Sequence, residues 1–332
     1  MHTLHDDFSG RPVAEDAWKA LKPFRDNGAK SFDNFPIPQV RENYVASAKA
    51  NPLHEDKEPA TTDFQVDEFQ VRLYDPRPEA ERGQETPAVL YMHGGGWLMG
   101  NLETHNSSVR RLAVLTGLPV VAVDYRLAPE HTYPAAIDDC RAAYRWLSNP
   151  EAEHGLTVTS IAVAGDSAGG QLAATLANEF TALDDVAPLS AQVLLYPITD
   201  CSRDRTENGA SYKRLEEGFP LTANTMRWFI DTFVTEESQR TATDLSPLLL
   251  DELPEGLPPA LVITVDNDPL ADEGIEYAGK LAKAGVDVTH KHLVGYHHGL
   301  FTSAAIIDRG EEELARVAEF ITVCLLYTSD AA

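Results

Sequence analysis

The chain has 332 residues, of which 43% are hydrophobic and 24% are charged. These are ordinary values for a globular protein and exclude a disordered or fibrous chain. The 52 Asp and Glu residues outnumber the 27 Lys and Arg residues, so the formal net charge is -25. Such a charge repels phosphate backbones and anionic lipids. We therefore expect neither nucleic-acid binding nor stable membrane association.

The lack of a visible targeting signal and the spacing of the cysteines favour a cytoplasmic protein. The first ten residues are acidic and lack the apolar run of a secretory signal. No apolar stretch reaches the roughly 18 residues that a membrane helix needs. Cys140, Cys201 and Cys324 show neither a disulfide framework nor metal-ligand spacing. We therefore expect a cytoplasmic chain with no bound metal.

Hydropathy patterns predict two helices, at residues 14–24 and 39–50, before any strand. From residue 64 onward, short β-rich runs alternate with longer helical segments. The expected strands lie at residues 64–67, 69–73, 88–92, 120–123, 161–164, 193–195, 261–265 and 286–293. The expected helices lie at residues 105–116, 134–147, 168–180, 271–284 and 311–323. Most of the strands are continuous apolar runs, which suit a parallel sheet buried on both faces.

This alternation predicts an α/β fold with a mostly parallel central sheet flanked by helices. In such sheets, ligands bind at the carboxyl ends of the strands. The segment at residues 201–247 interrupts the alternation with a polar loop and then an apolar helix at residues 222–234. That helix contains Met226 and Phe229, and it either packs in the core or covers a binding site.

The sequence Gly165-Asp166-Ser167-Ala168-Gly169 follows an expected strand and precedes an expected helix. This Gly-x-Ser-x-Gly pattern is typical of a tight strand-to-helix turn that raises a serine hydroxyl above the sheet. The glycines remove Cβ atoms that would collide in the turn. The helix that follows directs its N-terminal amides toward the same point.

A second motif, His93-Gly94-Gly95-Gly96-Trp97, follows the expected strand at residues 88–92. Three consecutive glycines allow backbone N–H groups to approach a bound oxygen without obstruction by side chains. Together with the amide that follows the serine, these N–H groups would form an oxyanion hole. We therefore expect acyl-transfer chemistry at this edge of the sheet.

A serine nucleophile needs a base, and the base needs a carboxylate that fixes its tautomer. His297 and His298 follow the expected strand at residues 286–293. We prefer His298, which is followed by glycine, and His297 remains an alternative. Asp268 closes the preceding strand and is the preferred carboxylate, with Asp266 in reserve. The order Ser, Asp, His along the chain is the one expected of an α/β-hydrolase.

Together these motifs resemble the hormone-sensitive-lipase-like carboxylesterases, bacterial family IV of the α/β-hydrolase superfamily. The stretches at residues 100–105, 123–131 and 195–197 are similar to further stretches of that family. The catalytic residues that the resemblance implies are Ser167, Asp268 and His298. The oxyanion-hole residues that it implies are Gly95, Gly96 and Ala168, with Gly94 keeping the loop compliant. For His93 it implies a scaffold role, and Leu300 departs from the phenylalanine that is common in the family.

The resemblance also implies a helical cap over the catalytic domain. The cap would comprise residues 1–60 and 201–247, and the α/β-hydrolase domain residues 61–200 and 248–323. Residues 324–332 fit no expected element, and we predict that this tail is either disordered or of non-native origin. The family further implies a possible homodimer through the last strand and helix.

The expected function is that of a serine carboxylesterase, which hydrolyses short-to-medium acyl-chain esters through an acyl-enzyme and needs no cofactor. A covered site of limited volume favours short acyl chains on a small-molecule ester. Trp97, Met226 and Phe229 are candidates for the substrate pocket, although core packing explains them equally well. The alternatives are an amidase, lactonase or thioesterase that uses the same triad, and a non-catalytic ligand-binding protein.

Overall fold

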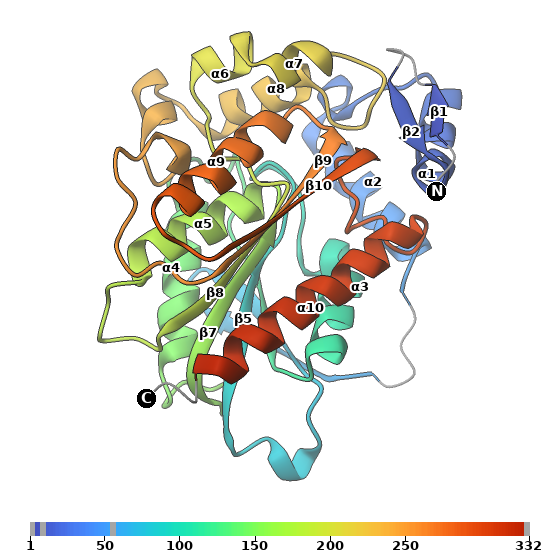
Figure 1. The fold of residues 1–332 in the computed structure, drawn as a ribbon. Helices are drawn as coiled ribbons and strands as arrows, with labels where there is room; N and C mark the ends of the chain where they lie inside the picture. The colour runs from blue at the N-terminus through green and yellow to red at the C-terminus, as the bar shows by residue number, and fades with distance from the viewer. Residues whose placement is uncertain (1–3, 7–10, 54–57, 329–332) are drawn as a thin grey trace.

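The centre of the fold is an eight-stranded sheet with the strand order β10-β9-β8-β7-β5-β6-β4-β3 (Figure 1). The computed structural model describes residues 4–6, 11–53 and 58–328. The strands of this sheet are β3 (Ala60–Val66), β4 (Phe69–Asp75), β5 (Glu85–Met92), β6 (Val120–Asp124), β7 (Thr157–Asp166), β8 (Leu189–Leu195), β9 (Ala260–Asn267) and β10 (Val288–His297). Strand β4 pairs antiparallel with both β3 and β6, and every other pairing in the sheet is parallel. The expected strands and the expected mostly parallel sheet are confirmed.

The expected helices are also present in the described part of the chain. They are α1 (Glu15–Asp26), α2 (Ile37–Ala50), α3 (Leu102–Thr116), α4 (Ala135–Ser148), α5 (Ala168–Phe180), α8 (Ala223–Phe233), α9 (Ala271–Lys283) and α10 (Asp308–Thr328). The polar segment before α8 was expected to be a loop, but it contains two short helices, α6 (Arg203–Asn208) and α7 (Ala210–Arg214). Helix α6 begins where the Ser202 side chain accepts a hydrogen bond from the Arg205 amide, a local capping signal that hydropathy does not reveal. A two-stranded sheet of β1 (Leu4–Asp6) and β2 (Pro12–Ala14) was not predicted either.

The central strands β5 to β9 are buried on both faces over most of their length, which explains why they contain continuous apolar runs. Alternate residues of β5 point to opposite faces, as they must in an extended strand. Leu90 and Met92 join a core that includes residues of α4, α5 and α9. Val89 and Tyr91 join a second core that includes residues of α3 and α10. The helices therefore hold the sheet rigid from both sides, and the carboxyl ends of its strands remain available for a site.

Helices α6, α7 and α8 lie together at the upper edge of Figure 1, near the ends of β9 and β10. The N-terminal segment meets this group through side-chain contacts. The Ser31 hydroxyl donates a hydrogen bond of 3.1 Å to the Phe219 carbonyl oxygen, and the rings of Phe32 and Phe229 lie 6.2 Å apart. The two segments that interrupt the α/β alternation therefore pack against each other.

Helix α10 continues to Thr328, beyond its expected end at residue 323. Leu325 is buried in the core beside α3 and α10. The predicted disorder of the tail is therefore wrong as far as Thr328, because apolar burial extends the helix by more than a turn. Residues 329–332 lie outside the described residues, and the non-native origin of the tail stays a prediction.

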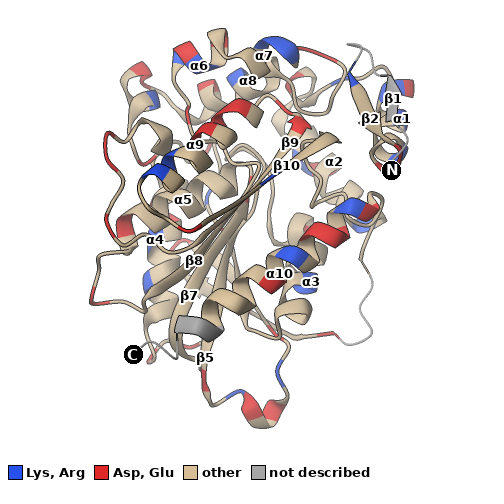
Figure 2. Ribbon diagram, viewed as in Figure 1, with Lys and Arg blue, Asp and Glu red and all other residues tan. Residues whose placement is uncertain are grey.

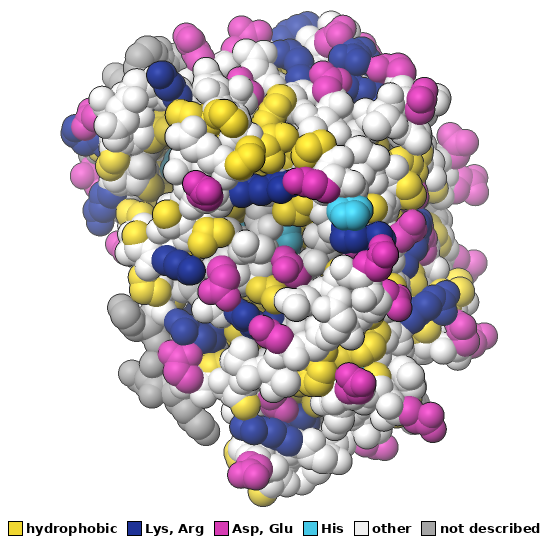
Figure 3. All heavy atoms as spheres, turned by 180° about the vertical axis from the view of Figure 1, so that it is seen from behind, with side chains coloured by type: hydrophobic (Ala, Val, Ile, Leu, Met, Phe, Trp, Pro, Cys, Tyr) yellow, Lys and Arg dark blue, Asp and Glu magenta, His cyan; other side chains and the backbone are white. Residues whose placement is uncertain are grey.

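The acidic side chains are distributed over the helices and loops of the fold and do not gather in one segment (Figure 2). The opposite face shows acidic and basic side chains interspersed with apolar patches (Figure 3). Among the described residues, no helix combines the length and the apolarity that crossing a membrane requires.

Candidate active site

Ser167 stands at the turn between β7 and α5, with φ 57° and ψ −118°. A positive φ is uncommon for a residue other than glycine and indicates a conformation that the surrounding structure imposes. The neighbouring glycines allow this turn. A Cβ on Gly165 would lie 2.2 Å from the Gly169 carbonyl oxygen, and one on Gly169 would lie 2.0 Å from the Met92 carbonyl oxygen. The Ser167 side chain makes no capping hydrogen bond to α5 and lines a cavity.

The glycine loop after β5 presents backbone amides beside Ser167. Gly95 and Gly96 have φ values of +124° and +58°, which suit glycine. The loop turns back on itself because the amides of Leu98 and Met99 both donate to the Gly95 carbonyl oxygen, at 3.1 and 3.0 Å. Within the described residues, no hydrogen bond is seen from the amides of Gly95, Gly96 and Ala168. These amides are therefore available to a bound oxyanion.

Asp166 holds the glycine loop against the serine turn. Its Oδ1 accepts hydrogen bonds from the Gly94 amide at 3.0 Å and the Tyr91 hydroxyl at 2.8 Å, and His105 Nε2 lies 3.2 Å away. Burial alone would raise the pKa of Asp166, but the neighbouring His105 and Tyr91 outweigh burial and hold this pKa below its usual value. Sequence reasoning assigned no role to Asp166, although a carboxylate inside the turn was a visible signal.

His93 packs against the glycine loop and supports it. Its ring stacks on Tyr125 at 4.1 Å, and its Nδ1 lies 2.8 Å from the Gly94 carbonyl oxygen. The Tyr125 hydroxyl donates to the His93 carbonyl oxygen at 2.7 Å. Burial lowers the pKa of His93 to about 3, so its ring is neutral at physiological pH. This environment agrees with the expected scaffold role.

Asp268 and His298 meet at the ends of β9 and β10. His298 Nδ1 donates a hydrogen bond of 2.7 Å to Asp268 Oδ2. Asp268 is fully buried, and its Oδ1 accepts a hydrogen bond of 2.9 Å from the Leu270 amide. The His298 ring packs 4.4 Å from the ring of Tyr196 and lines the same cavity as Ser167. A carboxylate at Nδ1 leaves Nε2 to exchange protons with a substrate or a hydroxyl.

The two alternatives from the sequence have other partners. His297 borders the cavity, but it is buried, and its Nδ1 lies 2.8 Å from the His298 carbonyl oxygen. Burial lowers the pKa of His297. Asp266 forms an ion pair with Arg11 and accepts a hydrogen bond of 3.4 Å from the Gly295 amide. The geometry therefore brings together Asp268 and His298, the preferred pair.

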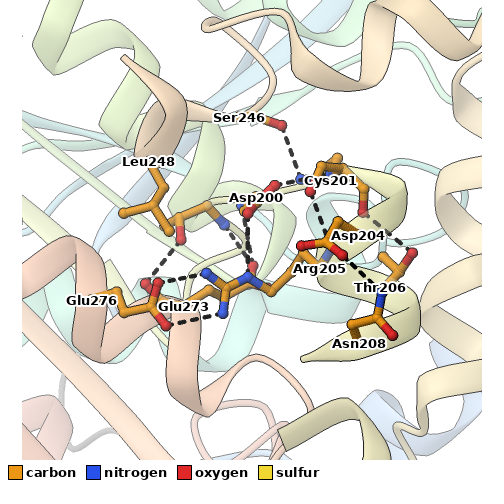
Figure 4. A network of polar contacts seen from close by, with 12 residues as sticks. Asp200, Cys201, Asp204, Arg205, Thr206, Asn208, Ser246, Leu248, Glu273 and Glu276 are labelled. Atoms are coloured by element: carbon orange, nitrogen blue, oxygen red, sulfur yellow. Dashed lines mark hydrogen bonds and ion pairs between the residues drawn. The ribbon is translucent and has the colours of Figure 1, made fainter. Parts of the chain in front are cut away.

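A partly buried polar network joins α6, the segment after β8 and α9 (Figure 4). Glu273 on α9 accepts hydrogen bonds at Oε1 from the amides of Thr199 and Asp200, at 2.8 and 3.3 Å. Arg205 of α6 lies between Asp200 and Glu276 and bonds to both carboxylates. Burial raises the pKa of Glu273 well above its usual value. This network ties α6 and the end of β8 to the helix that follows Asp268.

The cavity over Ser167 has a volume of about 340 Å³. Its lining combines residues of the glycine loop, the serine turn and the loop after β10 with residues of the N-terminal segment and α8. The apolar lining residues from the latter two segments include Phe32, Phe35, Val40 and Phe229. Sequence reasoning missed the N-terminal ones, because Phe32 and Phe35 lie between the two expected helices and an amphipathic pattern does not specify what Val40 faces.

The comparisons with known proteins agree with this geometry. A protein family described as having an alpha/beta hydrolase fold matches residues 89–302. The chain belongs to this family. An ethyl acetate hydrolase of Pseudomonas putida is 39% identical to this α/β-hydrolase over 249 residues, which cover 75% of this chain and 76% of the relative. A carboxylesterase of Mycobacterium tuberculosis is 39% identical over 234 residues, 69% of this chain and 71% of the relative.

Solved esterase structures share the whole architecture of this α/β-hydrolase. An ester hydrolase from the metagenome of Lake Arreo has a TM-score of 0.83 and 34% identity, and the match covers 94% of this chain and 98% of the other. An esterase from Pyrobaculum calidifontis has a TM-score of 0.80 and 32% identity, with coverages of 94% and 98%. The resemblance to hormone-sensitive-lipase-like carboxylesterases is therefore confirmed.

Of the three expected pocket residues of this α/β-hydrolase, only Phe229 lines the cavity. The prediction was wrong for Trp97, whose buried ring stacks on Phe233 at 4.8 Å while its Nε1 donates to Gln171 Oε1 at 3.1 Å. It was also wrong for Met226, which is buried in the core below α8. Both side chains are buried among apolar residues of the core and do not border the cavity.

Proposed function

We propose that this chain is a serine carboxylesterase with Ser167 as nucleophile, His298 as base and Asp268 as the partner of the base. The observation that carries this assignment is the 2.7 Å hydrogen bond between His298 Nδ1 and Asp268 Oδ2, beside the cavity that Ser167 lines. The names of the relatives support the reaction class, because they include an ethyl acetate hydrolase and carboxylesterases.

The reaction begins when the Ser167 hydroxyl attacks the ester carbonyl carbon and passes its proton to Nε2 of His298. The carbonyl oxygen becomes an oxyanion and accepts hydrogen bonds from the amides of Gly95, Gly96 and Ala168, each worth about 3 kcal/mol in the transition state. The N-terminal end of α5 adds a partial positive charge at the same point. Buried Asp268 fixes the tautomer of His298 and stabilises the imidazolium.

Collapse of the tetrahedral intermediate breaks the ester C–O bond. His298 gives its proton to the leaving alcohol, and the acyl group stays on Ser167. A water molecule then attacks the acyl-enzyme while His298 accepts its proton. The carboxylic acid leaves, the proton returns to Ser167, and no cofactor takes part.

The histidine doublet provides the test of this assignment. We expect His298→Asn to lower kcat for p-nitrophenyl butyrate by at least about 10³-fold, because the base is lost. His297→Asn should cost far less, because the His297 ring is buried and bonded to backbone. Equal losses in the two variants, with both folded by circular dichroism, would contradict the assignment of His298.

We further propose that residues 1–60 and 201–247 form a cap that limits the acyl chain. The cavity of about 340 Å³ is at the small end of the range of roughly 300–1,000 Å³ for ligand pockets. Phe32 and Phe229, one from each cap segment, lie 6.2 Å apart on its wall. We therefore expect p-nitrophenyl butyrate to be hydrolysed faster than the palmitate ester, and the reverse order would overturn the short-chain proposal.

A further inference from the structure

Helix α2 forms a wall of the cavity through Val40, Asn43, Tyr44, Ser47 and Ala48. Only Val40 among its described side chains is buried. Ile37 and Tyr44 are partly buried and pack against the core, and the Tyr44 ring lies 6.0 Å from the ring of His105. Burial of side chains is the main source of helix stability in a protein, and a polar anchor adds to this partial packing of α2.

Arg41 provides that anchor through four hydrogen bonds. Its Nε donates to the Leu98 carbonyl oxygen at 2.7 Å, and its Nη2 donates to the Ala128 carbonyl oxygen at 2.7 Å. Both Nη atoms also bond to Glu130, at 2.8 and 2.7 Å. A guanidinium has five N–H donors, and Arg41 uses four of them across two other segments of the chain.

The ion pair stays charged over the whole range in which a histidine base works. The Arg41 guanidinium beside Glu130 lowers the pKa of that carboxyl to about 2. A bidentate arginine–carboxylate pair also fixes the plane of the guanidinium. The orientation of the two N–H groups that reach the carbonyl oxygens is therefore set by Glu130.

Both carbonyl acceptors belong to the backbone that holds the glycine loop. The Leu98 amide donates to the Gly95 carbonyl oxygen at 3.1 Å. The Ala128 amide donates to the Trp97 carbonyl oxygen at 2.9 Å. One side chain of α2 is thus bonded to the carbonyl oxygens of the two residues whose amides anchor the turn with the proposed oxyanion donors.

We propose that Arg41 is a positioning residue for ester hydrolysis, and that it fixes the separation between the α2 wall and the glycine loop. This inference rests on the proposed function, because it concerns the cavity over Ser167. Arg41 does not line that cavity among the described residues, so it acts through α2 and the loop and not on the substrate. By holding the wall, Arg41 sets the size of the acyl group that the cavity accepts.

Substitution of Arg41 should therefore alter substrate binding and acyl-chain preference more than the chemical step. In Arg41→Met the apolar stem remains and all four hydrogen bonds are lost. We expect KM for p-nitrophenyl butyrate to rise about tenfold with a smaller change in kcat, since loss of positioning weakens binding in the ground and transition states alike. The ratio of kcat/KM for octanoate to that for butyrate should rise, because the wall can move outward.

Two control variants separate positioning from stability. Arg72 also makes three hydrogen bonds, to Asp63 and Glu103, and contacts neither α2 nor the glycine loop. Arg72→Met should lower Tm and leave KM and the octanoate-to-butyrate ratio unchanged. Arg41→Lys, which keeps the charge but reaches fewer acceptors, should recover part of the wild-type KM.

The proposal is contradicted if Arg41→Met lowers Tm as Arg72→Met does while KM and the chain-length ratio stay at wild-type values. It is also contradicted if Arg41→Lys shows no recovery relative to Arg41→Met. Labelling of the wild-type protein by a fluorophosphonate tests the proposed function separately. A labelled Ser167 together with an unaffected Arg41→Met variant would reject the role of Arg41 alone.

Discussion

A single methyl group on Gly96 should damage both the fold and the reaction. A Cβ added there would lie 2.3 Å from Cγ of Phe229 and 2.4 and 2.6 Å from two further ring atoms. The φ of Gly96 is +58°, a conformation that an L-residue adopts with strain. In Gly96→Ala, either Phe229 or the glycine loop must therefore move.

Gly96→Ala should have two effects on stability and one on catalysis. The left-handed conformation costs about 1–2 kcal/mol, and overpacking against the ring costs about 1–3 kcal/mol. Together these lower the free energy of unfolding by about 2–5 kcal/mol. Displacement of the Gly96 amide also removes one of the proposed oxyanion donors, which should lower kcat by about 10²–10³-fold.

Gly117 supplies a matched control for this prediction. It ends α3 with φ +70°, and nothing lies within 4 Å of its added Cβ. Gly117→Ala should therefore show the conformational strain of about 1–2 kcal/mol without a loss of kcat. The assays are urea unfolding and hydrolysis of p-nitrophenyl butyrate under saturating substrate.

The double variant Gly96→Ala/Phe229→Ala tests the cause of the loss. Removal of the ring creates room for the new methyl group, so part of the kcat should return. The reasoning is refuted if Gly96→Ala retains kcat within about threefold of wild type, because displacement of an oxyanion-hole donor lowers kcat by a much larger factor.

Two further predictions concern the carboxyl groups behind the site. Asp268→Asn should lower kcat by about 10⁴-fold with little change in stability, because an amide selects the wrong tautomer of His298; a loss below tenfold in steady-state hydrolysis would contradict this role. Glu273→Gln should retain most activity, because burial raises the pKa of Glu273 and so favours the neutral form, which glutamine resembles. The pKa of this carboxyl is raised in the folded state and near its usual value in the unfolded state. Its contribution to wild-type stability therefore falls as pH rises above about 4.5, by up to about 1.4 kcal/mol per pH unit. Glu273→Gln lacks this loss, and its stability relative to wild type should rise between pH 5 and pH 8 in urea titrations; a pH-independent difference would exclude a protonated Glu273.

Much of the fold could be predicted because its signals are local. Each buried strand is an apolar run, and the turn at Ser167 needs glycines that the sequence shows directly. The choice of His298 over His297 was made from sequence on a neighbouring glycine alone. The hydrogen bond to Asp268 and the burial of His297 supply its physical reason.

The walls of the cavity could not be predicted, because they depend on contacts between distant segments. Arg41 bonds to Leu98 and Glu130, which are 57 and 89 residues away along the chain. The orientation of Trp97 depends on Phe233 in the same way. Hydrophobic side chains near a catalytic motif are compatible with either face of their segment, and only packing decides between the core and the cavity.

The identity of the nucleophile is tested most directly by covalent trapping. The protein is incubated with a fluorophosphonate, and its intact mass and peptide map are measured, with His298→Asn treated in parallel. We expect one adduct, on Ser167, formed far more slowly in the variant because the hydroxyl lacks its base. An adduct on another residue, or continued ester hydrolysis by a protein that carries no adduct on Ser167, would contradict the account.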